Sequence, residues 1–179
     1  MDETTVFSIP GKKTKVTLQG IIDIYKRECA THGQKNIKLI VGTDSQRVGK
    51  NVFLTTAFTL YRQGKGGRIF YLRRKRDAKR YSVIATRLLK EAEYTINITQ
   101  AFISLLQNQM DVGENVNDFV TNVRFEVHFD ANPDVMHASN QIVHAVSGWA
   151  NGMGLEYHIK PEAWGASTVA DKFAQGKAR

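Results

Sequence analysis

The chain has 179 residues, a hydrophobic fraction of 42% and a formal net charge of +8, with one cysteine. This length and composition can bury one sizeable core, which predicts a single domain over residues 1–179. A lone cysteine excludes an intrachain disulfide, and no apolar run is long enough for a signal peptide or a membrane span, so a cytoplasmic protein is expected.

The first part of the chain predicts a short helix followed by a strand. From Thr17 to Cys29 apolar residues recur at helical spacing, and Thr17 can cap the N-terminus of that helix. The helix precedes a core expected at about residues 36–175. Residues 38–43 read Lys-Leu-Ile-Val-Gly-Thr, a continuous apolar run typical of a strand buried on both faces. This strand is expected to end at Asp44.

Two further strand patterns follow and predict an antiparallel meander. Residues 52–61 alternate and are rich in strand formers, residues 64–67 form a glycine-rich turn, and residues 68–72 resume the strand pattern. A dense basic block comes directly after this strand and comprises Arg73, Arg74, Lys75, Arg76, Lys79 and Arg80. Because each basic side chain brought against a phosphate releases a counterion, the block predicts nucleic-acid binding.

The second half of the chain alternates helical and strand patterns. In order these are a long amphipathic helix, a strand, a helix, a short strand and a last helix, at residues 81–107, 123–129, 136–153, 156–159 and 167–174. Asp130 follows the strand, Trp149 lies in the apolar pattern of its helix and is expected in the core, and Ser167 is expected to cap the last helix.

This order of elements predicts an α/β fold with a mixed five-stranded sheet flanked by helices. The arrangement resembles the ribonuclease-H-like fold. That fold brings carboxylates together from the end of the first strand, the long helix after the third strand, the end of the fourth strand and the last helix. The corresponding candidates here are Asp44, Glu91 or Glu93, Asp130 and Asp171.

Carboxylate oxygens suit a hard cation, so Mg²⁺ or Mn²⁺ is the expected cofactor, with Asp44, Asp130 and Asp171 as metal ligands. Two such ions about 4 Å apart can activate a water and stabilise the leaving oxygen of a phosphodiester. Glu91 and Glu93 point in nearly opposite directions on a helix, so only one can face the site. Glu91 lies on the flank of the apolar stripe, and Glu93 lies on its far side.

Several separated motifs resemble the YkuK family, a ribonuclease-H-like group. They are Val41-Gly-Thr-Asp-Ser-Gln46, His128-Phe-Asp130, and Gly154-Leu-Glu-Tyr-His-Ile-Lys-Pro161 followed by Ala166-Ser167 and Ala170-Asp171. The resemblance spans roughly residues 15–175 and implies the fold and a metal site, but no particular activity. The chain departs from the family after Asp130, where Ala-Asn-Pro-Asp replaces a glycine-containing loop.

Each candidate also has a purely structural interpretation. Asp44 could cap a turn, Asp171 could favour a helix start, and Asp134 is typical of a turn or helix cap. His128 shares the side of its strand with Asp130, where it could orient a water or phosphate or simply be hydrogen-bonded. Polar residues that could contact phosphate near the strand ends are Ser45, Gln46 and Lys160.

The sequence therefore favours a metal-dependent nuclease or a related phosphodiester-processing protein that acts on nucleic acid. It contains no P-loop, dinucleotide-binding fingerprint, nucleophile elbow or zinc-protease motif. The alternatives are a non-catalytic nucleic-acid-binding module and a protein-interaction scaffold on the same fold. Metal-dependent cleavage would distinguish the first hypothesis from the other two.

Overall fold

The computed structural model describes residues 5–109, 123–134, 136 and 139–170. Its frame is a seven-stranded sheet in the order β2-β1-β5-β4-β3-β6-β7. The strands are β1 Val6–Ser8, β2 Lys15–Thr17, β3 Ile37–Val48, β4 Asn51–Arg62, β5 Gly66–Asp77, β6 Arg124–His128 and β7 Glu156–His158. The helices are α1 Leu18–His32, α2 Ile84–Asn108 and α4 Asn140–Gly152, with short turns η1 Gln34–Asn36, η2 Ala78–Tyr81 and η3 Gly165–Ala170.

The sheet is mixed, as predicted. Strands β3, β4 and β5 form an antiparallel meander, whereas β6 runs parallel to β3 and β7 runs parallel to β6. The predicted count of five strands omits β1 and β2, which extend the sheet beyond β5 through the pairing of Ser8 with Tyr71. Strands of three residues are too short to give a recognisable period-two pattern.

The meander strands are longer than their apolar segments. Residues 44–48 of β3 pair with residues 51–55 of β4, which in turn pair with residues 73–77 of β5. Asp44 therefore lies inside β3 and not after its end, and the first four residues of the basic block lie inside β5. In this part of the meander β4 keeps Val52 and Leu54 in a buried cluster, whereas β3 and β5 continue mainly with polar residues, so their apolar pattern stops early.

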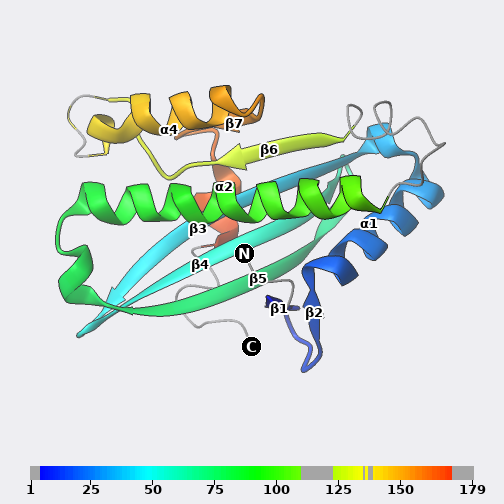
Figure 1. Ribbon diagram of the computed structural model, residues 1–179, viewed down its shortest axis with the longest axis horizontal. Helices are drawn as coiled ribbons and strands as arrows, with labels where there is room; N and C mark the ends of the chain where they lie inside the picture. The colour runs from blue at the N-terminus through cyan, green and yellow to red at the C-terminus, as the bar shows by residue number, and fades with distance from the viewer. Residues whose placement is uncertain (1–4, 110–122, 135, 137–138, 171–179) are drawn as a thin grey trace.

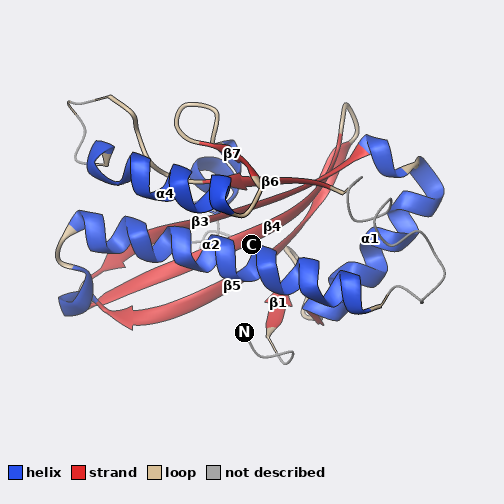
Figure 2. Ribbon diagram, turned by 45° about the horizontal axis from the view of Figure 1, so that its top comes forward, coloured by secondary structure: helices blue, strands red, loops and turns tan. Residues whose placement is uncertain are grey.

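Helices α1, α2 and α4 cover one face of the sheet, and η3 lies against the other (Figures 1 and 2). Thr17 caps α1 as predicted, because its side chain accepts a hydrogen bond from the Gly20 amide at 3.1 Å. Helix α2 crosses the middle of the sheet, and Phe102 packs there against the rings of Phe58 and Phe125. This packing fixes α2 along β3.

Two predictions about the C-terminal helices are wrong. Trp149 is 43% exposed, because α4 packs through the neighbouring stripe of Ile142, Val146 and Ala150 and leaves its next face in solvent. The last helix was expected over 167–174 with Ser167 as its cap, but the described segment is a π-helical turn that begins at Gly165 and contains Ser167. Residues 171–174 lie outside the described part of the chain.

Within the described ranges, no helix combines the length and the apolar character needed to cross a bilayer.

Candidate metal centre

Two aspartates are brought together by the parallel pairing of β3 with β6. The last registered pair is Gly42 with His128. Asp44 follows two residues later within β3, and Asp130 follows two residues later, just beyond the end of β6. Since side chains alternate between the two faces of a strand, both carboxylates start from the face that η3 covers. Ladder pairing between β3 and β6 ends before Asp44, which leaves room for side chains to meet there.

The third carboxylate comes from α2. Glu91 is 3% exposed, and its Oε1 accepts a hydrogen bond from the Ser45 hydroxyl at 2.5 Å. Asp44, Glu91 and Asp130 each offer a carboxylate oxygen, and these oxygens lie within 4.8 Å of one another. Three acidic side chains from β3, α2 and the end of β6 therefore converge on one point, as the sequence predicted for four such positions.

Helix α2 is held in register with β3 by a row of threonines beside Glu91. The Thr95 hydroxyl lies 2.9 Å from the Thr43 hydroxyl and 3.0 Å from the Glu91 carbonyl oxygen. Thr43 in turn is 2.9 Å from the Thr56 hydroxyl on β4. All three threonines are buried, so these bonds are shielded from water and fix the height at which Glu91 reaches the aspartates.

The positive charge close to Glu91 is too small to stabilise its carboxylate in the ionised form. Burial, followed by the negative charge of Asp44, raises the pKa of Glu91 well above its ordinary value. The Ser45 hydrogen bond opposes this shift, and the Arg87 guanidinium opposes it weakly because its Nε is 3.9 Å away. Glu91 Oε2 is buried without a hydrogen-bond partner. A bound divalent cation would satisfy this oxygen and relieve the repulsion.

Asp130 already has one cationic neighbour. Lys160 Nζ lies 2.7 Å from Asp130 Oδ1, and the Lys160 amide donates to the Ala131 carbonyl at 2.9 Å. The Ile-Lys-Pro motif therefore brings an ammonium group to the edge of the carboxylate cluster. The sequence suggested Lys160 only as a contact for phosphate, and nothing in its local pattern indicated that it pairs with Asp130.

Two predicted site residues remain, Glu93 and Asp171, together with Asp134, which the sequence indicated as a turn or helix-cap residue outside the site. Glu93 points away from the cluster and forms an ion pair with Lys90 at 2.6 Å, so α2 presents Glu91 and not Glu93. Asp171 lies outside the described residues. Asp134 acts as a turn residue, because its side chain accepts from the Met136 amide at 2.9 Å.

The ribonuclease H-like family model matches residues 20–175. This chain belongs to the ribonuclease H-like family. Uncharacterized protein YkuK of Bacillus subtilis (strain 168) is 25% identical over 166 residues, which are 91% of this chain and 94% of that protein. No solved structure gives a significant match. The predicted fold and the resemblance to YkuK are thus confirmed, whereas the family by itself assigns no activity.

In this ribonuclease H-like sheet, the basic block is divided between two faces. Arg73 and Lys75 are on the same face as Asp44, because the register runs from Asp44 through Thr55 to Arg73. Arg74 and Arg76 are on the opposite face, where both contact the Tyr94 side chain of α2. Lys79 and Arg80 are exposed in η2.

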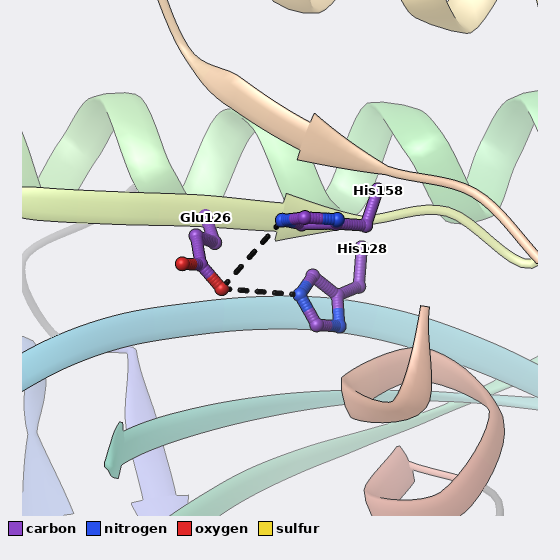
Figure 3. A group of neighbouring side chains, drawn as sticks. All are labelled: Glu126, His128 and His158. Carbon is purple, nitrogen blue, oxygen red and sulfur yellow. Dashed lines mark ion pairs between the residues drawn. The ribbon is translucent and has the colours of Figure 1, made fainter. Parts of the chain in front are cut away.

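A second cluster of titratable groups lies farther back on the same face as Asp130. Glu126 and His128 are two residues apart on β6, and His158 is registered beside His128 on β7 (Figure 3). Glu126 Oε2 is 3.7 Å from His128 Nε2 and 3.8 Å from His158 Nε2. Two imidazoles and a carboxylate are also the donors of many zinc sites, so the protonation of each group has to be considered.

The protonation state argues against a metal at this cluster. The Gly165 amide donates to His128 Nδ1 at 2.9 Å, so the proton of the neutral ring is on Nε2. Burial, followed by the charge of His158, lowers the pKa of His128 to about 4, so the ring is neutral. A metal on Nε2 would move the proton to Nδ1, directly against the Gly165 amide. Lys38 already neutralises Glu126 through its own contact.

The histidine cluster instead anchors the segment that covers this face. Besides the Gly165 hydrogen bond, the Trp164 ring meets His128 edge-on at 5.5 Å and Tyr61 at 5.6 Å. The sequence hypothesis of a hydrogen-bonded structural histidine thus describes the observed contacts of His128. The signal missed in the sequence was Gly165, whose importance depends on a contact 37 residues away.

Replacing Gly165 by alanine is expected to destabilise the protein by about 1–3 kcal/mol, the usual cost of overpacking. The added Cβ would lie 2.8 Å from Ile40 Cγ2 and 2.9 Å from His128 Nδ1, and both neighbours are buried. Urea unfolding measures the effect. Gly148→Ala in α4 is the matched control, because its Cβ meets nothing within 4 Å and should stabilise the helix slightly. Equal stability of the two variants would contradict the expected clash.

Proposed function

We propose that this protein is a divalent-metal-dependent nuclease, or a related phosphodiester-processing enzyme, that acts on nucleic acid. The observation that carries the proposal is the convergence of Asp44, Glu91 and Asp130 within 4.8 Å, with Glu91 buried and its second oxygen without a hydrogen bond. A cluster of three carboxylates, with Glu91 buried and the two aspartates partly buried, costs free energy unless a cation or protons compensate it. Oxygen ligands of this kind fit Mg²⁺ or Mn²⁺.

Each residue of the carboxylate cluster would have a separate role in binding the cation. Asp44 and Asp130 would hold the cation from the sheet, Glu91 would complete the set from α2, and Asp171 remains a further candidate. The cation, when bound, would lower the pKa of a water and stabilise charge on the phosphate oxygens. The Ser45 hydroxyl orients Glu91 through their hydrogen bond. Lys160, beside Asp130, is suited to contact a phosphate oxygen of the substrate.

The charge distribution supports nucleic acid as the substrate. The chain carries a formal net charge of +8, and the exposed side chains of Arg73 and Lys75 start from the same sheet face as Asp44. A polyanion drawn to this face would meet the carboxylate cluster at its edge. Phosphate contacts of this kind supply affinity that does not depend on base sequence.

The proposal is tested by titrating Mn²⁺ into the wild-type protein by calorimetry and assaying labelled single- and double-stranded DNA, RNA and hybrid in the same buffer. We expect metal binding and cleavage of at least one substrate, with cleavage lost in EDTA and restored by Mg²⁺ or Mn²⁺. Nucleic-acid binding without metal binding or cleavage would contradict the enzyme and leave the binding module.

One observation favours that second candidate, a non-catalytic nucleic-acid-binding module. Lys160 Nζ at 2.7 Å from Asp130, together with the Arg87 guanidinium near Glu91, could compensate part of the carboxylate charge without a metal. In that case Lys160→Ala would destabilise the protein and would not create tighter Mn²⁺ binding. In the enzyme, by contrast, freeing Asp130 from Lys160 should tighten Mn²⁺ binding, which calorimetry measures.

A further inference from the structure

A continuous strip of side chains leads from the carboxylate cluster toward the tip of the β3–β4 hairpin. On the face of Asp44, the register sets Thr55 and Arg73 beside it, and the next row toward the tip contains Gln46, Phe53 and Lys75. Diagonal neighbours on one sheet face are about 7–8 Å apart, so Phe53 is one such step from Asp44. The strip crosses three strands and needs no rearrangement of the backbone.

Phe53 is an aromatic side chain that the core does not use. Among the described residues it belongs to none of the buried clusters, and its side chain is partly exposed. The guanidinium carbon of Arg73 lies 4.0 Å from the centre of the Phe53 ring. Aromatic rings and arginine planes are the surfaces on which unpaired nucleobases stack.

A basic hollow of about 900 Å³ opens at the tip of the β3–β4 hairpin, where Lys75 comes from the face of the strip and Arg47 and Arg76 come from the opposite face. It lies between the β3–β4 turn and η2, which are joined by the hydrogen bond from the Ala78 amide to the Lys50 carbonyl. Five of its lining residues are basic and one is acidic. The basic residues are Arg47, Lys50, Lys75, Arg76 and Lys79, and the acidic one is Asp77.

The acidic residue offsets only one of the five positive charges, and its carboxylate also accepts a hydrogen bond from the Lys79 amide at 2.9 Å. Arg76 is already oriented, since its guanidinium donates to the Tyr94 hydroxyl at 2.9 Å. Lys75 belongs both to the strip and to the hollow. Arg47 follows Asp44 by three residues, which is about 10 Å along a strand. Because Arg47 starts from the opposite face, a nucleic-acid strand reaches the hollow within a few nucleotides of the carboxylates by turning around the edge of the hairpin at Lys75.

We propose that an unpaired nucleic-acid strand runs from the carboxylate cluster over Phe53 into the basic hollow, with a base stacked on the Phe53–Arg73 pair and a backbone phosphate among the lysines and arginines. The inference rests on the proposed function for the end of the strand that meets the carboxylates. It specifies the substrate as single-stranded, because the bases of a duplex are already stacked and their faces are not accessible.

The stacking step is tested by the affinity of a fluorescent single-stranded oligonucleotide, measured by anisotropy in EDTA so that no cleavage occurs. Phe53→Leu should weaken binding about 5-fold to 100-fold, the usual effect of losing one base stack, whereas Phe53→Trp should preserve it. Neither variant should change the affinity for a duplex of the same length. Equal binding of the single strand by the leucine and tryptophan variants would overturn the stacking step.

The phosphate step is tested by the salt dependence of the same binding. Lys50→Gln/Lys79→Gln should lower affinity and reduce the slope of log K against log salt by about 1.4, since each lost contact to a single strand contributes about 0.7. Lys12→Gln/Lys13→Gln is the control of equal charge, because both lysines are exposed in the β1–β2 turn outside the hollow. Equal slopes for the two double variants would overturn the proposal.

Pyrophosphate titration separates a nucleic-acid strand from a small phosphate compound. If the Lys50→Gln/Lys79→Gln variant loses pyrophosphate binding but keeps full oligonucleotide affinity, the hollow serves a small molecule and the proposal fails. Because all of these measurements are made without metal, their results do not depend on whether the protein cleaves nucleic acid. Strand binding without any metal-dependent cleavage would contradict the proposed enzyme and support the strand path.

Discussion

Joint replacement of Asp44 and Asp130 by asparagine is expected to abolish Mn²⁺ binding and to lower nuclease activity about 100-fold or more. The two aspartates supply the sheet side of the carboxylate cluster, and a bound cation contributes several kcal/mol of charge stabilisation in phosphodiester chemistry. Asparagine keeps the size of each side chain and removes its charge. Calorimetric titration and the cleavage assay on the preferred substrate measure the two effects.

The double variant should remain folded, which separates loss of metal from loss of structure. Removing two negative charges beside buried Glu91 relieves repulsion, so the metal-free variant should be at least as stable as the wild type in urea. Lys160 loses its partner but is 40% exposed and can be hydrated. Asp23→Asn/Asp134→Asn is the control of equal charge change and should bind metal normally. Retained Mn²⁺ binding in the Asp44→Asn/Asp130→Asn variant would contradict the assigned ligands.

Glu91→Gln is expected to stabilise the metal-free protein at pH 8, by on the order of 1 kcal/mol, and to weaken Mn²⁺ binding severely. Burial, and then the charge of Asp44, raises the pKa of Glu91, so the folded protein holds this proton where the unfolded chain has lost it. The resulting stability is fully present below about pH 4.3 and is lost as the pH rises through the folded pKa. Glutamine is neutral at every pH, so the stability of the variant does not fall in this way as the pH rises.

The measurement is the free energy of unfolding in urea from pH 4 to pH 9, in EDTA, for the wild type and Glu91→Gln. His128 has the opposite dependence, because its lowered pKa of about 4 makes both proteins lose stability as the pH falls below about 6.5. The difference between the two curves cancels this contribution and should widen with rising pH. Glu93→Gln, two residues along α2 and paired with Lys90 away from the cluster, is the control and should not show this widening. A flat difference for Glu91→Gln would show that ionising the buried Glu91 carboxylate does not lower the free energy of unfolding.

Much of the fold was encoded in local patterns. The capping Thr17, the uninterrupted apolar spacing of α2 and the alternation before Asp130 each depend on residues close in sequence, and the structure has the elements they predict. Helical periodicity put Glu91 on the flank of the apolar stripe but left both Glu91 and Glu93 as candidates, and it is the structure that brings Glu91 to Asp44 and Asp130. The motifs shared with YkuK predicted the family.

Other features depended on contacts between residues far apart in the chain. Asp44 and the basic block were expected outside the strands because the apolar pattern stops there, yet cross-strand pairing continues through Asp44 and through the first four residues of the block. That pairing sends Arg73 toward the carboxylate face and Arg74 toward α2. Trp149 fits the apolar pattern of its helix, but which side of α4 is buried depends on what packs against it.

The sequence by itself thus determined the three meander strands, β6, β7 and the three longer helices, since these segments follow from periodicity and capping. Only the tertiary structure decided the convergence of Asp44, Glu91 and Asp130, the pairing of Lys160 with Asp130, and the hydrogen bond that ties Gly165 to His128. Strand register and helix placement set these contacts, and both arise from packing between segments tens of residues apart, which no local pattern records.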